Sequence, residues 1–112
     1  MNKIINDEIH ALVKAEADKL YKTQLGWRRH LHPSPETAFN EFKTTEFLKK
    51  ICKQIGVKII PIKLPTGLLV EIKNGKGKTA AVRTDIDALP VTELTDIPFK
   101  SKIKGCMHAC GH

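Results

Sequence analysis

The chain has 112 residues, which is room for one modest domain and excludes a two-domain enzyme for this chain as given. Hydrophobic residues make up 41% and charged residues 28%, so the composition is that of a globular protein rather than a disordered or fibrous one. The formal net charge is +7, from 19 Lys and Arg against 12 Asp and Glu.

This basic balance raises the question of a nucleic-acid or membrane partner. Sixteen of the basic residues are Lys and three are Arg, whereas bidentate phosphate contacts and base readout favour Arg. The densest lysine tract, Lys100–Lys104, lacks aromatic residues on which bases could stack. The longest apolar stretches, such as Ile59–Ile62, are far shorter than the roughly 18 residues of a membrane span. We therefore expect neither a nucleic-acid nor a membrane partner.

The cysteines and the N-terminal segment indicate the cellular compartment in which the protein is expected. Residues 1–8 contain no apolar run of signal-peptide length. An odd number of cysteines without such a signal favours thiols over a disulfide framework, and the three are Cys52, Cys106 and Cys110. The sequence thus predicts a cytoplasmic location.

Two helices are expected first along the chain. Apolar residues recur at helical spacing from Ile5, which predicts one long amphipathic helix ending near Leu31. The prolines in His32–Pro35 stop it, because proline disfavours helical geometry in the residue before it and donates no backbone hydrogen bond. A second helix follows Glu36, with Gly56 as its C-terminal cap. Its predicted buried side comprises Phe39, Phe42, Phe47, Leu48, Ile51 and Ile55.

Three strands are expected after the helices. Residues 57–62, 68–72 and 79–83 are rich in β-branched and apolar residues. Asn74–Gly77 lies between the last two runs and tolerates positive φ, which predicts a hairpin between the second and third strands. From Thr84 to Lys104 the pattern indicates a loop.

The densest cluster of reactive side chains comes at residues 106–112. Cys106, His108, Cys110 and His112 alternate one by one with other residues, so either an extended or a helical backbone could present several of them together. Thiolate and imidazole suit zinc and its first-row neighbours, although four ligands from seven residues would be cramped around one ion. The alternative is that the cysteines are small core residues and the histidines bond locally.

Two further groups are candidates for a site. Asp85 and Asp87 follow the third expected strand, where an α/β sheet usually binds ligands, but Asp is equally common in turns. The cluster of Arg28, Arg29, His30 and His32 with Glu36 could face a substrate, and a solvated helix end is the favoured interpretation.

Three segments, taken in order, resemble a known family. They are Arg28–Glu36 with Glu41 and Thr44, Arg83–Pro90 with Glu93, and Met107–His112, with Thr66–Gly67 between the first two. Together they resemble the metal-dependent amidohydrolases of the aminoacylase, hippurate hydrolase and auxin-conjugate hydrolase family. The resemblance extends from about Leu25 to the last residue.

The resemblance implies an α/β fold, namely the N-terminal part of a zinc-exopeptidase-like α/β/α catalytic domain with two helices and then a three-stranded portion of the sheet. It implies hydrolysis of the amide bond of N-acyl amino acids or peptides by two divalent ions, such as Zn, Mn, Ni or Co. Cys110 and His112 would be metal ligands, Asp85 would orient the metal site, and Cys106 and His108 would not be ligands.

The resemblance also implies what residues 1–112 would leave out. In the family the catalytic glutamate and the remaining metal ligands come after the Cys-Gly-His segment, and so does the smaller lid or dimerisation domain. We therefore expect an incomplete, inactive N-terminal portion of the catalytic domain, with a homodimer only in the full-length form. The rival hypothesis is a small Cys/His metal-binding module without catalysis.

Overall fold

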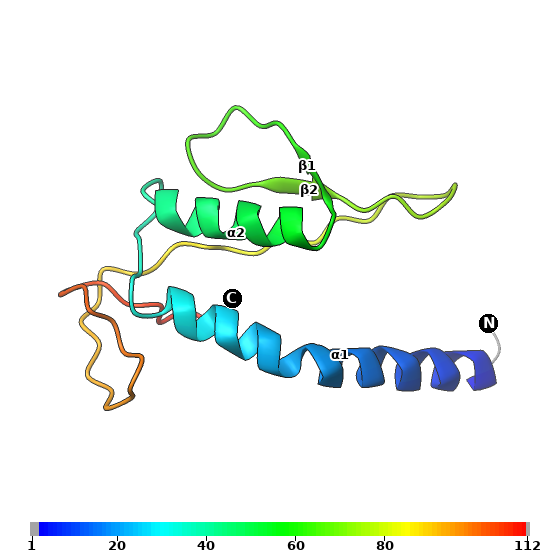
Figure 1. The fold of residues 1–112 in the computed structure, drawn as a ribbon, viewed down its shortest axis with the longest axis horizontal. Helices are drawn as coiled ribbons and strands as arrows, with labels where there is room; N and C mark the ends of the chain where they lie inside the picture. Colours follow the sequence, from blue (N-terminus) through cyan, green and yellow to red (C-terminus); the bar gives the residue numbers. More distant parts are fainter. Residues whose placement is uncertain (1–2, 112) are drawn as a thin grey trace. The chain divides into compact units, whose positions relative to one another are not determined.

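The computed structural model describes residues 3–111, and it divides the chain into two compact units at Leu31 and His32 (Figure 1). The first unit is the helix α1, Lys3–Leu31, which confirms the predicted long helix. Its last turn carries Arg28, Arg29 and His30, and arginine cations there interact favourably with the carbonyl end of the helix dipole. Apolar positions along it are exposed, among them Ile9, Leu12, Val13 and Leu20.

The second unit begins with the helix α2, Phe42–Gln54. Glu36 supplies the cap at its start: Lys43 N–H donates to Oε1 at 3.1 Å and Thr44 N–H to Oε2 at 2.8 Å. At its end Gly56 adopts a φ of 76°, its N–H bonds to Lys53 O, and Val57 N–H bonds to Cys52 O. This is a Schellman arrangement, so the predicted glycine cap is confirmed.

The predicted buried side of this helix is only partly correct. Ile51 is buried, but Phe39, Phe42 and Ile55 are exposed. The other buried residues of α2 are Thr44 and Thr45. Helical spacing marks one face of the helix, but it does not show how far the neighbouring segments cover that face.

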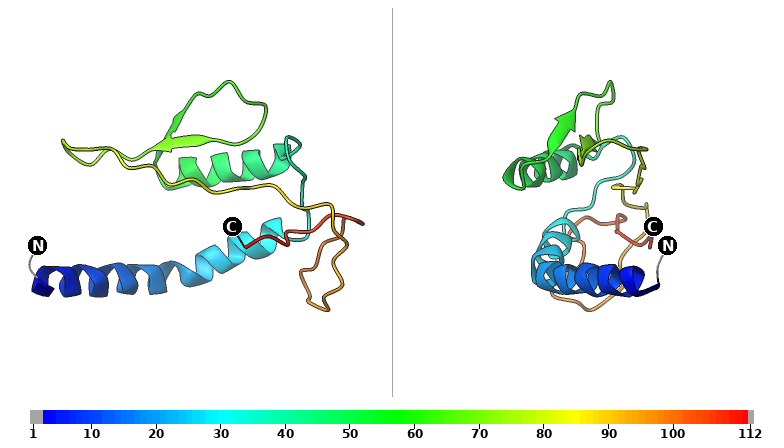
Figure 2. Two further views of the ribbon diagram at one scale, coloured as in Figure 1. Left: turned by 180° about the vertical axis from the view of Figure 1, so that it is seen from behind. Right: turned by 90° about the vertical axis from the view of Figure 1, so that its right-hand side faces the viewer.

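Two short strands pair beside α2, β1 at Lys58–Ile60 and β2 at Leu69–Glu71 (Figure 2). They are antiparallel, with Ile59 opposite Val70. The first and second expected strands therefore form the hairpin, and the prediction that the second pairs with the third is wrong. The connection between β1 and β2 is tied to α2, because Thr66 Oγ1 donates to Glu41 Oε2 at 2.6 Å and Gly67 N–H donates to Thr45 Oγ1 at 2.8 Å.

The third expected strand, residues 79–83, is not a strand in the structure. Its residues are exposed, and Val82 is 98% exposed. A strand needs a neighbour that accepts its backbone hydrogen bonds, and no described strand pairs with these residues. The Asn74–Gly77 turn does form, with Gly75 at a φ of 80°.

The interior of the described chain is small and largely polar. Buried apolar residues are Pro35, Ile51, Ala88 and Cys106, and buried polar ones are His32, Glu41, Thr44, Thr45 and Thr66. Hydrogen bonds between segments therefore contribute much of the specificity of this packing. Within residues 3–111 no helix combines the length and apolar character needed to cross a membrane.

Candidate active-site region

Backbone hydrogen bonds bring the three characteristic segments of the sequence together. Thr37 forms a parallel bridge with Ala88, whose N–H donates to Glu36 O at 2.7 Å. Leu89 forms an antiparallel bridge with Met107, with N···O distances of 2.9 and 3.0 Å. Residues 85–90 thus run between the His32–Thr37 segment and the Met107–Gly111 segment, and all three belong to the second unit.

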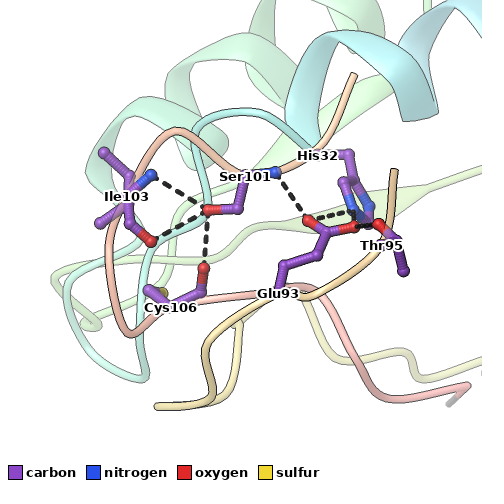
Figure 3. A network of polar contacts seen from close by, with 6 residues as sticks. All are labelled: His32, Glu93, Thr95, Ser101, Ile103 and Cys106. Carbon is purple, nitrogen blue, oxygen red and sulfur yellow. Dashed lines mark hydrogen bonds and ion pairs between the residues drawn. The ribbon is translucent and has the colours of Figure 1, made fainter. Parts of the chain in front are cut away.

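A buried polar network lies next to these bridges (Figure 3). His32 Nε2 is 3.1 Å from both carboxylate oxygens of Glu93, and the two side chains are only 5% and 1% exposed. Glu93 also accepts hydrogen bonds from Thr95 Oγ1 and from the Ser101 N–H, the latter at 2.6 Å. The His32 ring packs edge-on against Phe99, with ring centroids 5.7 Å apart.

These donors keep the Glu93 carboxyl ionised. The backbone N–H of Ser101 and the hydroxyl of Thr95 lower the pKa of Glu93 to about 2, with His32 adding to the effect and burial opposing it. An ionised carboxylate only accepts hydrogen bonds, so His32 must carry a hydrogen on Nε2. The network therefore fixes the charge of Glu93 and the donor atom of His32.

Ser101 extends this network to the Met107–Gly111 segment (Figure 3). Its Oγ donates to Cys106 O at 2.6 Å and accepts the N–H of Ile103 at 3.1 Å. The Cys106 thiol points to Pro35 O, with a sulfur–oxygen distance of 3.7 Å, and burial raises the pKa of that thiol. Cys106 is thus a small buried residue. This agrees with the alternative interpretation of the sequence, in which the cysteines are small core residues.

Of the two predicted metal ligands, the structure describes one. Cys110 is exposed and belongs to no disulfide, and His112 lies outside the described residues. Among residues 3–111 no three His, Cys, Asp or Glu side chains are grouped so that they could hold a metal ion. The donor type of Cys110 fits a zinc-like ion, and the described residues supply at most part of a ligand set. Cys106, His108 and Cys110 do not form a site of their own.

Some of the remaining candidate site residues are exposed to solvent, and others form hydrogen bonds within the fold. Asp85 forms an ion pair with Arg83, whose side chain is 84% exposed. Arg28, Arg29 and His30 are exposed on α1. His32 and Glu36, which the sequence grouped with them as a candidate substrate-facing patch, instead bind Glu93 and the start of α2.

The role of Glu93 was not apparent from its position in the sequence. It lies 61 positions from His32, in a region that periodicity assigns to a loop. The only signal is its place in the resemblance, which assigns it no role.

Comparison with known proteins identifies the relatives of this chain. Residues 81–112 match the family model described as peptidase family M20/M25/M40. A crystal structure from Bacillus subtilis, described as a dinuclear metal binding peptidase from the M20 family, superposes with a TM-score of 0.79 at 40% identity. The superposition covers 84% of this chain and 27% of that one. This chain is thus similar to M20 peptidases.

The curated relatives include proteins named as deacetylases and carboxypeptidases. An N-acetyl-L-cysteine deacetylase of Bacillus subtilis is 50% identical over 94 residues, which are 83% of this chain and 23% of the relative. A thermostable carboxypeptidase of Saccharolobus solfataricus is 44% identical over 87 residues, 76% of this chain and 22% of the relative. The chain therefore spans about a quarter of the length of the relatives it matches.

These M20 comparisons confirm two expectations from the sequence. The resemblance to metal-dependent amidohydrolases is confirmed, since residues 81–112 match the M20/M25/M40 family model and a deacetylase is 50% identical over 94 residues. The α/β fold class is also correct, because the two helices and the small sheet superpose on an M20 peptidase structure.

Proposed function

We propose that this chain is the N-terminal portion of the catalytic domain of a metal-dependent amidohydrolase, which hydrolyses the amide bond of N-acyl amino acids or peptides. The products would be a carboxylate and a free amino group. The observation that carries the proposal is the joining of three characteristic segments by backbone bridges, Thr37 with Ala88 and Leu89 with Met107. The names of the relatives support the substrate class.

In this proposal Cys110 and His112 bind the metal, and Asp85 helps to orient the site. The candidate ions are Zn, Mn, Ni and Co; among them a thiolate favours Zn, and an imidazole suits Zn and Ni. When bound, two divalent ions supply Lewis-acid polarisation of the amide carbonyl and lower the pKa of a water molecule. Cys110 is an exposed residue. The three residues before Ala109 are Cys106, Met107 and His108, and they contact Ser101, Leu89 and His32 respectively.

The proposal places the lid domain, the catalytic glutamate and the other ligands in a longer protein. The share of each relative that the chain covers, about a quarter, supports this. A cytoplasmic location and a homodimer of the full-length form belong to the same proposal. The claim that the chain belongs to a longer protein is tested by immunocapture of the protein from its source cells, followed by intact mass spectrometry. A mass near 40 kDa is expected for a catalytic domain plus a lid, whereas 12.5 kDa would contradict the longer protein.

Activity is tested on the intact protein isolated from its source. We expect release of free amine from N-acetyl amino acids, loss of release after chelation, and recovery when Zn²⁺, Mn²⁺, Ni²⁺ or Co²⁺ is restored. Cys110→Ala should abolish recovery, while Cys52→Ala, at a half-buried position on α2, should leave it unchanged. Tight binding of one zinc with a gain of structure and no amine release would instead support the small metal-binding module.

A further inference from the structure

Glu93 has a carboxylate that the proposed chemistry does not use. It lies in the loop between residues 85–90 and 107–111, and its side chain is almost fully buried. Its donors come from two distant parts of the chain, since His32 follows α1 whereas Thr95 and Ser101 belong to the loop. Burying an ionised carboxylate costs free energy, and these hydrogen-bond donors offset that cost.

The contacts of Ser101 connect Glu93 to the segment that carries Cys110. Glu93 Oε2 accepts the Ser101 N–H at 2.6 Å, and the Ser101 hydroxyl donates to Cys106 O at 2.6 Å (Figure 3). Glu93 therefore acts on the backbone of residue 106 through a single intermediate residue.

The next two residues are held as well. Met107 pairs with Leu89 through two backbone hydrogen bonds. The His108 ring lies beside that of His32, with centroids 6.1 Å apart, and His32 is itself bonded to Glu93. Three consecutive residues just before Ala109 and Cys110 are thus fixed, two of them through the neighbours of Glu93.

We propose that Glu93 is a positioning residue that, through Ser101 and His32, sets the direction in which Cys110 presents its sulfur to a metal ion. The inference rests on the proposed function, in which Cys110 is a ligand. Residues that orient metal ligands without touching the metal typically change metal affinity by about ten- to a hundred-fold when they are replaced.

The test uses Co²⁺ and the intact protein, because thiolate ligation of Co²⁺ gives a charge-transfer absorption band in the near ultraviolet. Glu93→Gln should weaken Co²⁺ binding by about ten- to a hundred-fold and shift or reduce the band. The matched control Glu46→Gln, at an exposed position paired with Lys49, should change the affinity less than about two-fold. A purely structural role would lower the unfolding midpoint of Glu93→Gln and leave the affinity and band of its folded fraction unchanged, and that result would overturn the proposal.

If Glu93→Gln does not fold, two variants of Ser101 test whether the network around Glu93 positions Cys110. Ser101→Ala removes the hydroxyl that holds Cys106 O, and Ser101→Thr retains a hydroxyl. We expect weaker Co²⁺ binding for the alanine variant and recovery for the threonine variant; equal affinities would refute the inference. If the unaltered protein gives no thiolate band, or Cys110→Ala keeps it, the proposed function itself fails and this inference fails with it.

Discussion

His32 Nε2 lies 3.1 Å from both carboxylate oxygens of Glu93, although 61 positions separate the two residues. The contact joins the turn after α1 to the loop that leads to Cys106. Because both side chains are nearly inaccessible to solvent, the pair depends on the surrounding donors to replace water. Its properties give the first prediction.

Stability should depend on the ionisation of Glu93 in acid. Its pKa is lowered from 4.5 to about 2 by the donors described above, so its ionised form stabilises the fold fully above pH 4.5 and loses this contribution as the pH falls toward 2. We expect Glu93→Gln to lower the unfolding midpoint by several degrees at pH 7, with the difference from the unaltered protein shrinking below pH 4.5. Thermal unfolding followed by circular dichroism measures it. An equal difference at pH 7 and pH 3 would count against this role.

Glu36 should stabilise α2 although it lies outside the helix. Its carboxylate accepts the N–H groups of Lys43 and Thr44 and the Thr44 hydroxyl. Glu36→Ala leaves these donors without that partner, and we expect a loss of about 1 to 2 kcal/mol in the free energy of unfolding. Denaturant titration measures the loss. The exposed Glu46→Ala on the same helix should lower the free energy of unfolding clearly less than Glu36→Ala, and equal costs would disprove the capping role.

The bond between Thr66 and Glu41 should hold the connection between β1 and β2. Burial would raise the pKa of Glu41, but the hydrogen bonds from Thr66 and the nearby backbone outweigh it and lower that pKa. Thr66→Val removes the hydroxyl donor, so the pKa of Glu41 should rise and the fold should lose about 1 to 3 kcal/mol. Carboxyl chemical shifts and denaturant unfolding report the two effects. Thr79→Val, at an exposed position, serves as the control and should stay within about 0.5 kcal/mol.

Cys106 and Cys110 should differ in reactivity. Burial covers the Cys106 thiol and raises its pKa, whereas Cys110 is exposed. Because the thiolate is the reactive form, we expect Cys106 to be alkylated at least about ten times more slowly than Cys110 in the folded protein. Mass spectrometry of peptides after timed iodoacetamide treatment gives both rates. Similar rates before denaturation would show that Cys106 is not buried in solution.

The sequence predicted the features that depend on nearby residues. Helical periodicity and the prolines after Leu31 determine α1, and Gly56 ends α2 because it adopts a positive φ without steric cost. The same local reasoning failed at residues 79–83, where β propensity is present but no described strand pairs with them. A strand is completed by its neighbour, so its own residues are not sufficient to predict it.

Periodicity in the sequence predicted the helices, and the three characteristic segments carried the resemblance to metal-dependent amidohydrolases and the α/β fold that it implies. Only the tertiary structure decided that β1 pairs with β2, that the Cys106 thiol is buried against Pro35 O, and that Glu93 joins His32 to Ser101. The physical reason is the range of the interactions. Capping and helical spacing act within a few residues, whereas the partner of a buried charge is selected by how distant segments pack together.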